Sequence, residues 1–417
     1  MEIGYACLTV GVQDTMQKSC IAKNATDDKL QEIIIHNLNS LSNIIEYNVK
    51  NQIKLFRISS DLIPFGSSSI NSLSWWEIFK NEFAEIGSKI RNSGMRVSMH
   101  PGQYTVLNSL EEEVVERAIA DLNYHSLILD SLGLSSENKI VLHIGGVYDD
   151  KNESIKRFIA NYKRLSDSVK NRLVIENDDK SYNISEVLEI GRILNMPVIF
   201  DNLHNKVNPS PIENSEIYWI NECKKTWQEK DGNQKIHYSQ QDILKRAGGH
   251  SSYIRINEFM KFYEALERED IDIMLEVKDK NLSAIKCINC TRKDKNIQSL
   301  EIEWNKYKYK ILENSQEDYL EIIKLLANKD DYPCVSFYNL IEQGLKKESS
   351  KESFLNATMQ ILEILKNKST EKENARFTMN IESFKNGIIP KRKIRNNLWR
   401  LANQYNEVDL IESYFFM

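Results

Sequence analysis

Residues 172–179 read RLVIENDD, and the pattern within this stretch recurs along the chain. Leu173, Val174 and Ile175 form a short apolar run rich in β-branched residues, which is typical of a strand buried on both faces of a parallel sheet. The run ends in four polar residues that begin with Glu176. An unpaired carboxylate is costly to bury, so Glu176 requires a cation, a hydrogen-bonding partner or open solvent.

Eight such strands are expected within about the first 290 residues, and each is counted as one βα repeat, with a longer segment to about 227 after the strand at 197–201. A count of eight βα units predicts a closed (β/α)8 barrel, the TIM barrel of the α/β class. An open doubly wound sheet is the alternative, but no GxGxxG or GxxxxGK[ST] loop follows an early strand. The expected strands cover residues 2–8, 53–58, 95–99, 139–144, 173–176, 197–201, 235–239 and 271–277. The expected helices cover residues 28–49, 75–93, 110–133, 153–170, 184–194 and 255–269, and another begins near 280.

The composition changes near residue 295, so we expect a barrel domain over 1–294 and a mainly helical C-terminal extension over 295–417. Helical spacing is visible at 319–326 and 354–365. The segment 391–400 (KRKIRNNLWR) places five basic residues around Leu398 and Trp399. A solvated amphipathic helix is the simpler interpretation of that segment, and contact with nucleic acid is the alternative.

The overall composition is that of an ordinary globular protein, with 41% hydrophobic and 28% charged residues among 417. No apolar run approaches the length needed to cross a bilayer, and the N-terminus lacks the pattern of a secretion signal. Six cysteines do not suggest a disulfide framework. We therefore expect a cytoplasmic protein with reduced thiols. The net charge of −5 gives no global attraction to nucleic acid, although a local basic groove remains compatible with it.

Five of the seven histidines fall at or just after the expected C-terminal ends of strands, and three carboxylates join them. In a TIM barrel these strand ends meet on the face where active sites are built. Eight donors exceed the need of one ion, so the pattern predicts two or three divalent ions, with Glu176 central enough to bridge. Mixed nitrogen and oxygen donors suit Zn²⁺, Mn²⁺ or Fe²⁺ better than Mg²⁺. The set is His100, His143, His204, His237, His250, Glu176, Asp201 and Glu276.

Three further residues carry simpler or open interpretations. His36 and His125 lie on expected helices and are interpreted as structural. Lys235 shares a strand face with the expected ligand His237, where an ammonium group is unfavourable unless it contacts a phosphate, is deprotonated or is chemically modified. The alternative is that the strand begins at Lys235 and leaves its ammonium group at the solvent-exposed bottom of the barrel.

Seven segments of this chain closely resemble the UV damage endonuclease family, in the family's order, over about residues 1–290. They are RISSDLIP (57–64), HPGQY (100–104), IENDD (175–179), FDNLH (200–204), KIHYS (235–239), HSSYI (250–254) and EVK (276–278). The resemblance implies a TIM barrel and an ATP-independent DNA repair nuclease that acts on damaged double-stranded DNA without an obligate protein partner. Such an enzyme nicks the duplex immediately 5′ of a UV photoproduct and leaves a 3′-hydroxyl and a 5′-phosphate. Its usual metal is Mn²⁺, and Zn²⁺ is possible.

The resemblance also assigns roles to individual residues. The eight strand-end residues match metal ligands, and Glu176 is counted as catalytic as well. Gln103 and Tyr104 match a pair that probes the damaged duplex. Lys235 matches a lysine near the metals that can be carboxylated, and Tyr5 matches a tyrosine close to the site; both are expected to be catalytic.

Two departures from the family pattern and three rival functions stay open. The extension beyond about residue 295 is longer than the minimal family member needs. The loop after the RISS strand often supplies a further histidine ligand in this family, but this chain has Ser67, Ser68 and Ser69 there. The rivals are an AP endonuclease of the endonuclease IV type, a metal-dependent sugar isomerase and a non-catalytic damage-binding protein. Activation of water by a bound divalent ion needs no protein nucleophile, and no Ser-His-Asp or Cys-His arrangement competes with it.

Overall fold

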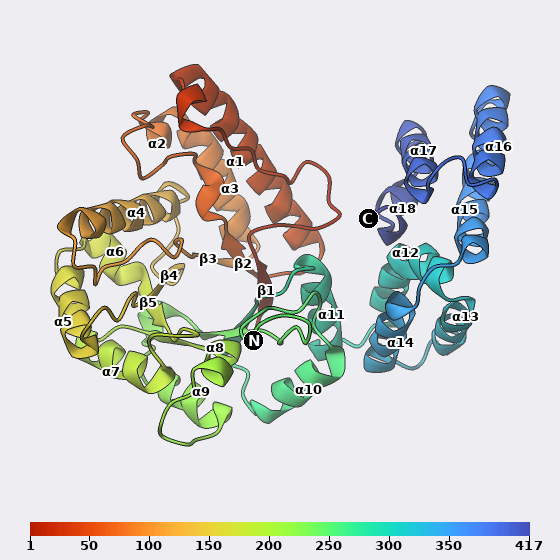
Figure 1. Cartoon of the computed structure of the whole chain (residues 1–417). Coiled ribbons are helices and arrows are strands. Elements are labelled where there is room, and N and C mark those ends of the chain that lie inside the picture. The colour runs from red at the N-terminus through yellow and green to blue at the C-terminus, as the bar shows by residue number, and fades with distance from the viewer. The chain divides into compact units, whose positions relative to one another are not determined.

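The computed structural model describes residues 1–417, and its N-terminal part is a closed barrel of eight parallel strands that pair in chain order from β1 to β8 and back to β1 (Figure 1). The predicted TIM barrel is therefore confirmed. The strands are β1 Ile3–Ala6, β2 Leu55–Ile58, β3 Arg96–Met99, β4 Lys139–His143, β5 Leu173–Glu176, β6 Val198–Asp201, β7 Gln234–Tyr238 and β8 Ile271–Leu275.

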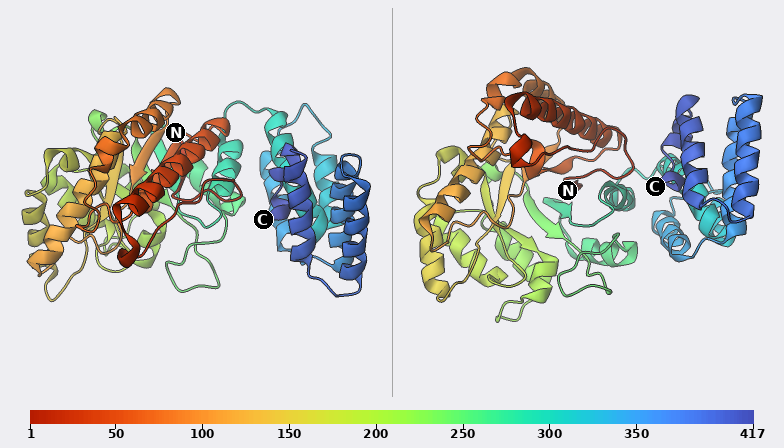
Figure 2. Two further views of the ribbon diagram at one scale, coloured as in Figure 1. Left: turned by 90° about the horizontal axis from the view of Figure 1, so that it is seen from above. Right: turned by 45° about the horizontal axis from the view of Figure 1, so that its top comes forward.

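Helices surround this barrel on its outside, as two further views show (Figure 2). They are α1 Asp27–Lys50, α2 Trp75–Ile78, α3 Lys80–Asn92, α4 Glu112–Ser131, α5 Lys151–Tyr162, α6 Asp167–Arg172, α7 Ile184–Leu194, α8 Asn202–Val207, α9 Glu216–Lys224, α10 Ile256–Ala265 and α11 Asn281–Thr291.

Two of the expected helices are each divided in two. The segment 75–93 breaks at Phe79, whose backbone leaves the helical region while its side chain is buried. The segment 153–170 breaks before Ser166, because the Ser166 hydroxyl accepts a hydrogen bond from the Val169 amide and starts α6.

The barrel interior is built in layers because alternate residues of each strand point inward. The register of β4 to β7 aligns His143 with Glu176 and Asp201 with His237. Two residues earlier on each of β4, β5 and β6 stand Val141, Val174 and Ile199, which pack with Trp227 as a buried apolar cluster. His143, Glu176, Asp201 and His237 therefore occupy the last inward-facing position of four neighbouring strands.

A layer of buried ion pairs lies at the opposite, N-terminal end of the strands. Arg96 Nη1 donates to Asp272 Oδ2 at 2.9 Å, and Lys139 Nζ donates to Asp231 Oδ1 at 2.5 Å. Arg96 also donates to the backbone carbonyl oxygens of Asp231 and Asn233. These bonds satisfy the buried charges and separate the barrel interior from solvent at that end.

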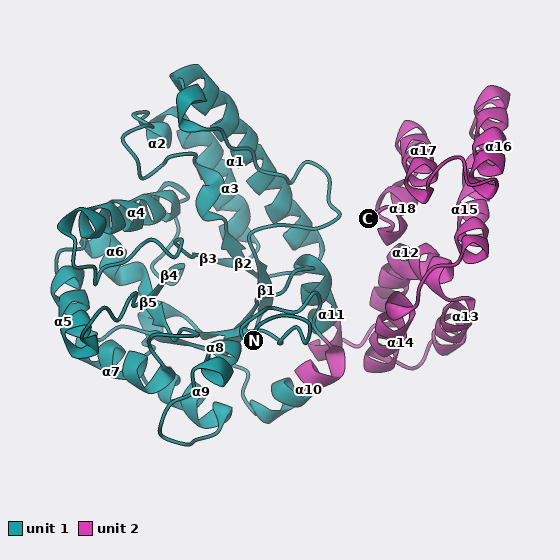
Figure 3. Cartoon of the chain, viewed as in Figure 1, with its two compact units in different colours: residues 1–254, 261–288 teal, residues 255–260, 289–417 magenta.

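Residues 255–260 and 289–417 form the second compact unit (Figure 3). The unit is helical and has its own core, in which Phe354, Phe384, Leu398 and Phe415 are buried. It begins six residues before the expected boundary at 295 and also takes the first turn of α10. Its other helices are α12 Ile297–Asn314, α13 Gln316–Leu325, α14 Cys334–Lys346, α15 Lys351–Lys366, α16 Glu371–Lys385, α17 Lys391–Gln404 and α18 Val408–Ile411. None of the helices in the chain is both long and apolar enough to span a membrane.

Candidate metal centre

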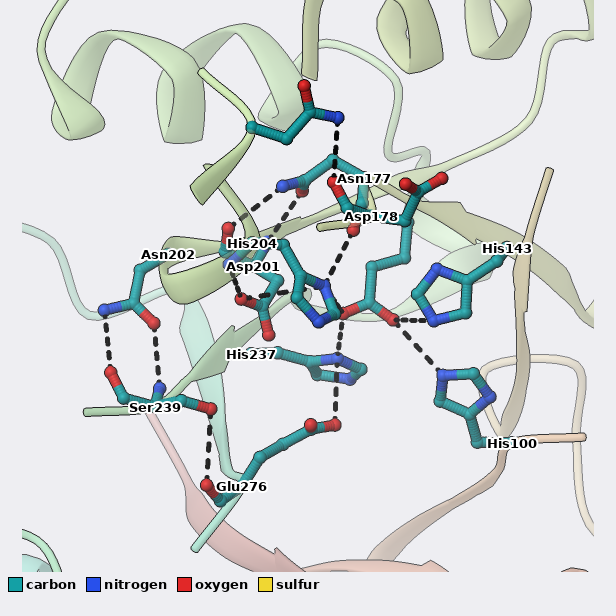
Figure 4. Close-up of polar contacts among 12 residues, drawn as sticks. His100, His143, Asn177, Asp178, Asp201, Asn202, His204, His237, Ser239 and Glu276 are labelled. Carbon is teal, nitrogen blue, oxygen red and sulfur yellow. Dashed lines mark hydrogen bonds and ion pairs between the residues drawn. The ribbon is translucent and has the colours of Figure 1, made fainter. Parts of the chain in front are cut away.

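Seven of the eight predicted ligands lie together at the C-terminal end of the barrel strands (Figure 4). They form three groups whose donor atoms lie within 4.8 Å of one another, and Glu176 belongs to every group. The groups are His100, His143 and Glu176; Glu176, Asp201 and His204; and Glu176, His237 and Glu276. His250 lies at the edge, where its Nε2 is 3.8 Å from Glu276 Oε2.

The two carboxylate oxygens of Glu176 face different histidines. Oε2 lies 3.3 Å from His100 Nε2 and 3.8 Å from His143 Nε2. Oε1 accepts a hydrogen bond from His237 Nδ1 at 2.7 Å and lies 3.7 Å from His204 Nδ1. This position agrees with the predicted bridging role, because one carboxylate can serve two ions through its two oxygens.

Several polar atoms of the cluster are buried without a hydrogen-bond partner. They include His143 Nδ1, Glu176 Oε2 and Asp201 Oδ2. Buried polar atoms nearly always have a hydrogen-bond partner, so several unpartnered atoms in one place indicate that a bound group is missing. The mixture of imidazole and carboxylate donors fits a borderline divalent cation. The residues present therefore fit a divalent metal centre.

The pKa shifts within the cluster also fit a divalent metal centre. Burial alone would raise the pKa of the Glu176 carboxyl, but three neighbouring histidines hold that pKa well below its usual range. Burial raises the pKa of Asp201, and the carboxylate of Glu176 adds to this effect. Burial opposes protonation of His204, yet Asp201 and Glu176 outweigh it and raise its pKa to about 9. Burial lowers the pKa of His143 to about 4. A divalent cation would relieve the repulsion between the carboxylates.

Three residues outside the predicted set hold the ligands in place. His204 Nδ1 lies 2.9 Å from the Asn177 carbonyl oxygen, and the Asn177 side chain bonds the Asp201 backbone in both directions. On the other side, Ser60 Oγ donates to the His100 carbonyl oxygen, and His125 Nε2 lies 2.9 Å from the same hydroxyl. His125 is thus a hydrogen-bonded structural residue beside the site. A ring N–H bond to a backbone carbonyl oxygen, as His204 makes to Asn177, fixes the orientation of a metal-binding histidine.

Arg57 is the site residue that our sequence reasoning missed. Its Nη2 donates to Glu276 Oε1 at 2.5 Å and to His237 Nε2 at 3.1 Å. Because arginine can only donate, His237 accepts at Nε2, which leaves Nδ1 as the ring nitrogen that faces Glu176. Arg57 therefore contacts two of the three donors of one metal group. The inward alternation of β2 was the available signal, since Arg57 follows the inward-facing Leu55 by two residues.

Lys235 is fully buried in the barrel, so the alternative that placed it at an exposed bottom is wrong. Strand β7 begins one residue before it, and the register pairs it with the buried Asp272. Its Nζ has no hydrogen-bond partner. Burial, together with the nearby guanidinium of Arg96, holds the pKa of Lys235 well below its usual range. Its surroundings therefore favour the uncharged amine over the ammonium ion.

The remaining predicted site residues divide into two kinds. Gln103 and Tyr104 lie exposed in the loop after β3, and 71% of Tyr104 is accessible to solvent. Tyr5 does not point into the barrel: its ring packs on Phe56, and its hydroxyl donates to Asn48 of α1. The strand alternation explains this correction, because Tyr5 pairs in register with Phe56 and not with the inward Arg57.

The fold and the cluster together define a class, the TIM-barrel proteins with strand-end histidines and carboxylates that fit a divalent metal. Comparison with family profiles narrows that class. Residues 1–305 match the profile described as UV-endonuclease UvdE, and the chain belongs to this family. Residues 308–417 match a second profile, described as Protein of unknown function (DUF1722).

Individual relatives agree with this assignment. The UV DNA damage endonuclease of Clostridium perfringens (strain 13 / Type A) is 42% identical over 382 residues, which cover 90% of this chain and 91% of that protein. The putative UV-damage endonuclease of Acanthamoeba polyphaga mimivirus is 33% identical over 69% of this chain and 90% of that protein. A solved structure described as "Crystal Structure of SacUVDE" is 36% identical, with a TM-score of 0.66, over 70% of this chain and 97% of that one.

Proposed function

We propose that this chain is a DNA repair endonuclease that nicks damaged duplex DNA immediately 5′ of UV photoproducts. One observation carries the proposal: three candidate metal groups share Glu176 in a barrel of the UV-endonuclease UvdE family. Relatives named UV DNA damage endonuclease favour this function over an AP endonuclease or a sugar isomerase. The cut would leave a 3′-hydroxyl and a 5′-phosphate, and the enzyme would act in the cytoplasm, where its DNA lies.

In the proposed chemistry, the three candidate metal groups hold divalent ions that act on the scissile phosphate. Bound divalent ions, for which we propose Mn²⁺, supply activated water and stabilise charge on the phosphate and the leaving oxygen. Glu176 would be common to all ions, with His100 and His143, Asp201 and His204, or His237 and Glu276 as the other donors. Arg57 would hold the Glu276 carboxylate in place. The Asn177 carbonyl oxygen would keep the His204 imidazole oriented, and the Ser60 hydroxyl would hold the His100 backbone.

For Lys235 we propose carboxylation of the side-chain amine by carbon dioxide. The neutral amine forms a new N–C bond, loses a proton and becomes a carbamate anion. The charges that surround Lys235 support this proposal, because Arg96, Arg57 and Lys139 oppose an ammonium there, whereas Asp272 favours it. An anion at the same place would be attracted by three cations.

Gln103 and Tyr104 are proposed to probe the duplex. They are exposed in the loop that begins directly after the proposed ligand His100. The Thr105 hydroxyl anchors this loop by donating to buried Asp121 at 2.6 Å. Tyr104 also lines a cavity of about 310 Å³. An aromatic ring and an amide can stack on and hydrogen-bond to bases that damage has already weakened in the helix.

A substrate comparison tests the proposal. The metal-loaded chain should nick a duplex with one cyclobutane thymine dimer much faster than an undamaged duplex, and chelation should stop the reaction. Nicking confined to an abasic duplex would replace the proposal by an AP endonuclease. Binding of the dimer duplex without any nicking would replace it by a non-catalytic damage-binding protein.

A further inference from the structure

The charge of the chain is unevenly distributed. Residues 1–288 carry 34 basic and 41 acidic side chains, an excess of seven negative charges. Residues 366–400 run from the last residue of α15 through α16 and most of α17. They carry ten basic and three acidic side chains, an excess of seven positive charges. A phosphate polyanion is therefore attracted to this segment and not to the barrel as a whole.

Helix α17 shows how this positive charge is arranged. Its buried face consists of Ile394, Leu398, Leu401 and Ala402. Arg395 is also turned inward, where it pairs with Glu313 at 2.5 Å and stacks on the Phe354 ring. The opposite face, which we call the α17 basic face, is solvent-exposed and consists of Arg392, Lys393, Asn396, Trp399 and Arg400.

The cations of this face have no protein partner. No ion pair or hydrogen bond of a carboxylate involves the side chains of Arg392, Lys393 or Arg400, whereas Lys306, Lys329 and Lys347 in the same unit each pair with an acid. The neighbouring helix α16 packs against α17 (Figure 1). It adds Lys372 and Arg376, which are exposed and form no ion pair. The helix itself gains nothing from Arg392 and Lys393, because cations in a first turn oppose the helix dipole.

We propose that the α17 basic face binds the sugar–phosphate backbone of duplex DNA without regard to sequence. Three side chains that can each neutralise a phosphate lie within ten residues of one helix, and the Asn396 amide adds a donor. Trp399, 41% exposed between them, offers a flat apolar ring for sugar or base contacts. This inference rests on the proposed function in taking DNA as the partner. A tethered second contact would keep the barrel near DNA by raising its effective concentration there.

The test compares two variants of the full chain with equal change in charge. Arg392→Gln/Lys393→Gln/Arg400→Gln removes the cations of the α17 basic face. The control Lys295→Gln/Lys324→Gln/Lys346→Gln removes three exposed, unpaired cations from other parts of the same unit. Binding to a labelled, undamaged duplex is measured with chelator present and over a range of salt concentrations. Thermal unfolding confirms that both variants fold.

The first variant should bind about tenfold more weakly, and its plot of log affinity against log salt should be shallower by about two to three than that of the parent. The control should behave as the parent does. Equal affinity and slope for all three proteins would overturn the proposal, as would an equal loss in both variants. Binding of the same proteins to phosphatidylglycerol vesicles is measured as well. If the first variant loses vesicle binding while its DNA binding stays intact, the proposal is overturned in favour of a membrane contact. Because the assay measures binding without cleavage, its failure is distinct from a failure to nick photoproducts.

Discussion

Replacing Glu176 with Gln should remove every bound metal ion, whereas replacing Glu276 with Gln should remove one. The geometry supports this difference, because Glu176 belongs to three donor groups and Glu276 to a single group. Glutamine keeps the side-chain volume but loses the negative charge. Even groups that only support a ligand change metal affinity by 10- to 100-fold, so loss of a direct ligand should cost at least about 100-fold, or about 2.7 kcal/mol, per ion.

Equilibrium dialysis against Mn²⁺ followed by elemental analysis measures the metal content of the parent and both variants. The Mn²⁺ concentration is set about tenfold above the dissociation constant of the parent, so that a 100-fold loss empties a group almost completely. The parent should hold two or three ions, Glu176→Gln close to none, and Glu276→Gln one fewer than the parent. A Glu176→Gln protein with the full metal content would refute the bridging argument. So would two variants that lose the same number of ions.

Three further predictions follow from the site. Lys235→Met should stop nicking. In metal-free, bicarbonate-free buffer, however, it should raise the free energy of unfolding at pH 7 by up to about 5 kcal/mol, the approximate cost of deprotonating a lysine of ordinary pKa about 10.4. The unfolded parent binds one more proton than the folded parent, so its free energy of unfolding rises with pH. Chemical denaturation should therefore show that the advantage of Lys235→Met over the parent shrinks by about 1.4 kcal/mol per pH unit toward pH 10. The double variant Gln103→Ala/Tyr104→Ala should nick a dimer duplex at least about tenfold more slowly in single-turnover assays while its metal content stays unchanged. Finally, His204 must lose its proton to bind a metal and its pKa is about 9, so Mn²⁺ affinity measured by calorimetry should rise by up to about tenfold per unit from pH 7 to 9 and then level off.

The strand pattern in the sequence was sufficient to predict the barrel and the metal cluster. Alternation within a strand fixes which residues share a face, and the C-terminal ends of barrel strands must converge. His143, Glu176, Asp201 and His237 could therefore be grouped before their distances were known. The match of residues 1–305 to the UV-endonuclease UvdE family supports the same interpretation.

Side-chain direction relative to neighbouring strands could not be predicted in the same way. Tyr5 and Arg57 are both polar residues on strands, yet the register sends Tyr5 toward α1 and Arg57 toward Glu276. That register depends on pairing between strands about fifty residues apart, which a local pattern does not contain. Asn177 and Ser60 act through backbone hydrogen bonds, and these depend on loop conformation.

The most direct test of the account is to map the nick on an end-labelled duplex that carries one cyclobutane thymine dimer, with Mn²⁺ or with chelator. We expect a single Mn²⁺-dependent cut at the phosphate immediately 5′ of the dimer, with a 3′-hydroxyl that a DNA polymerase extends. A cut elsewhere, a cut that survives chelation, or no cut by fully metal-loaded protein would contradict it.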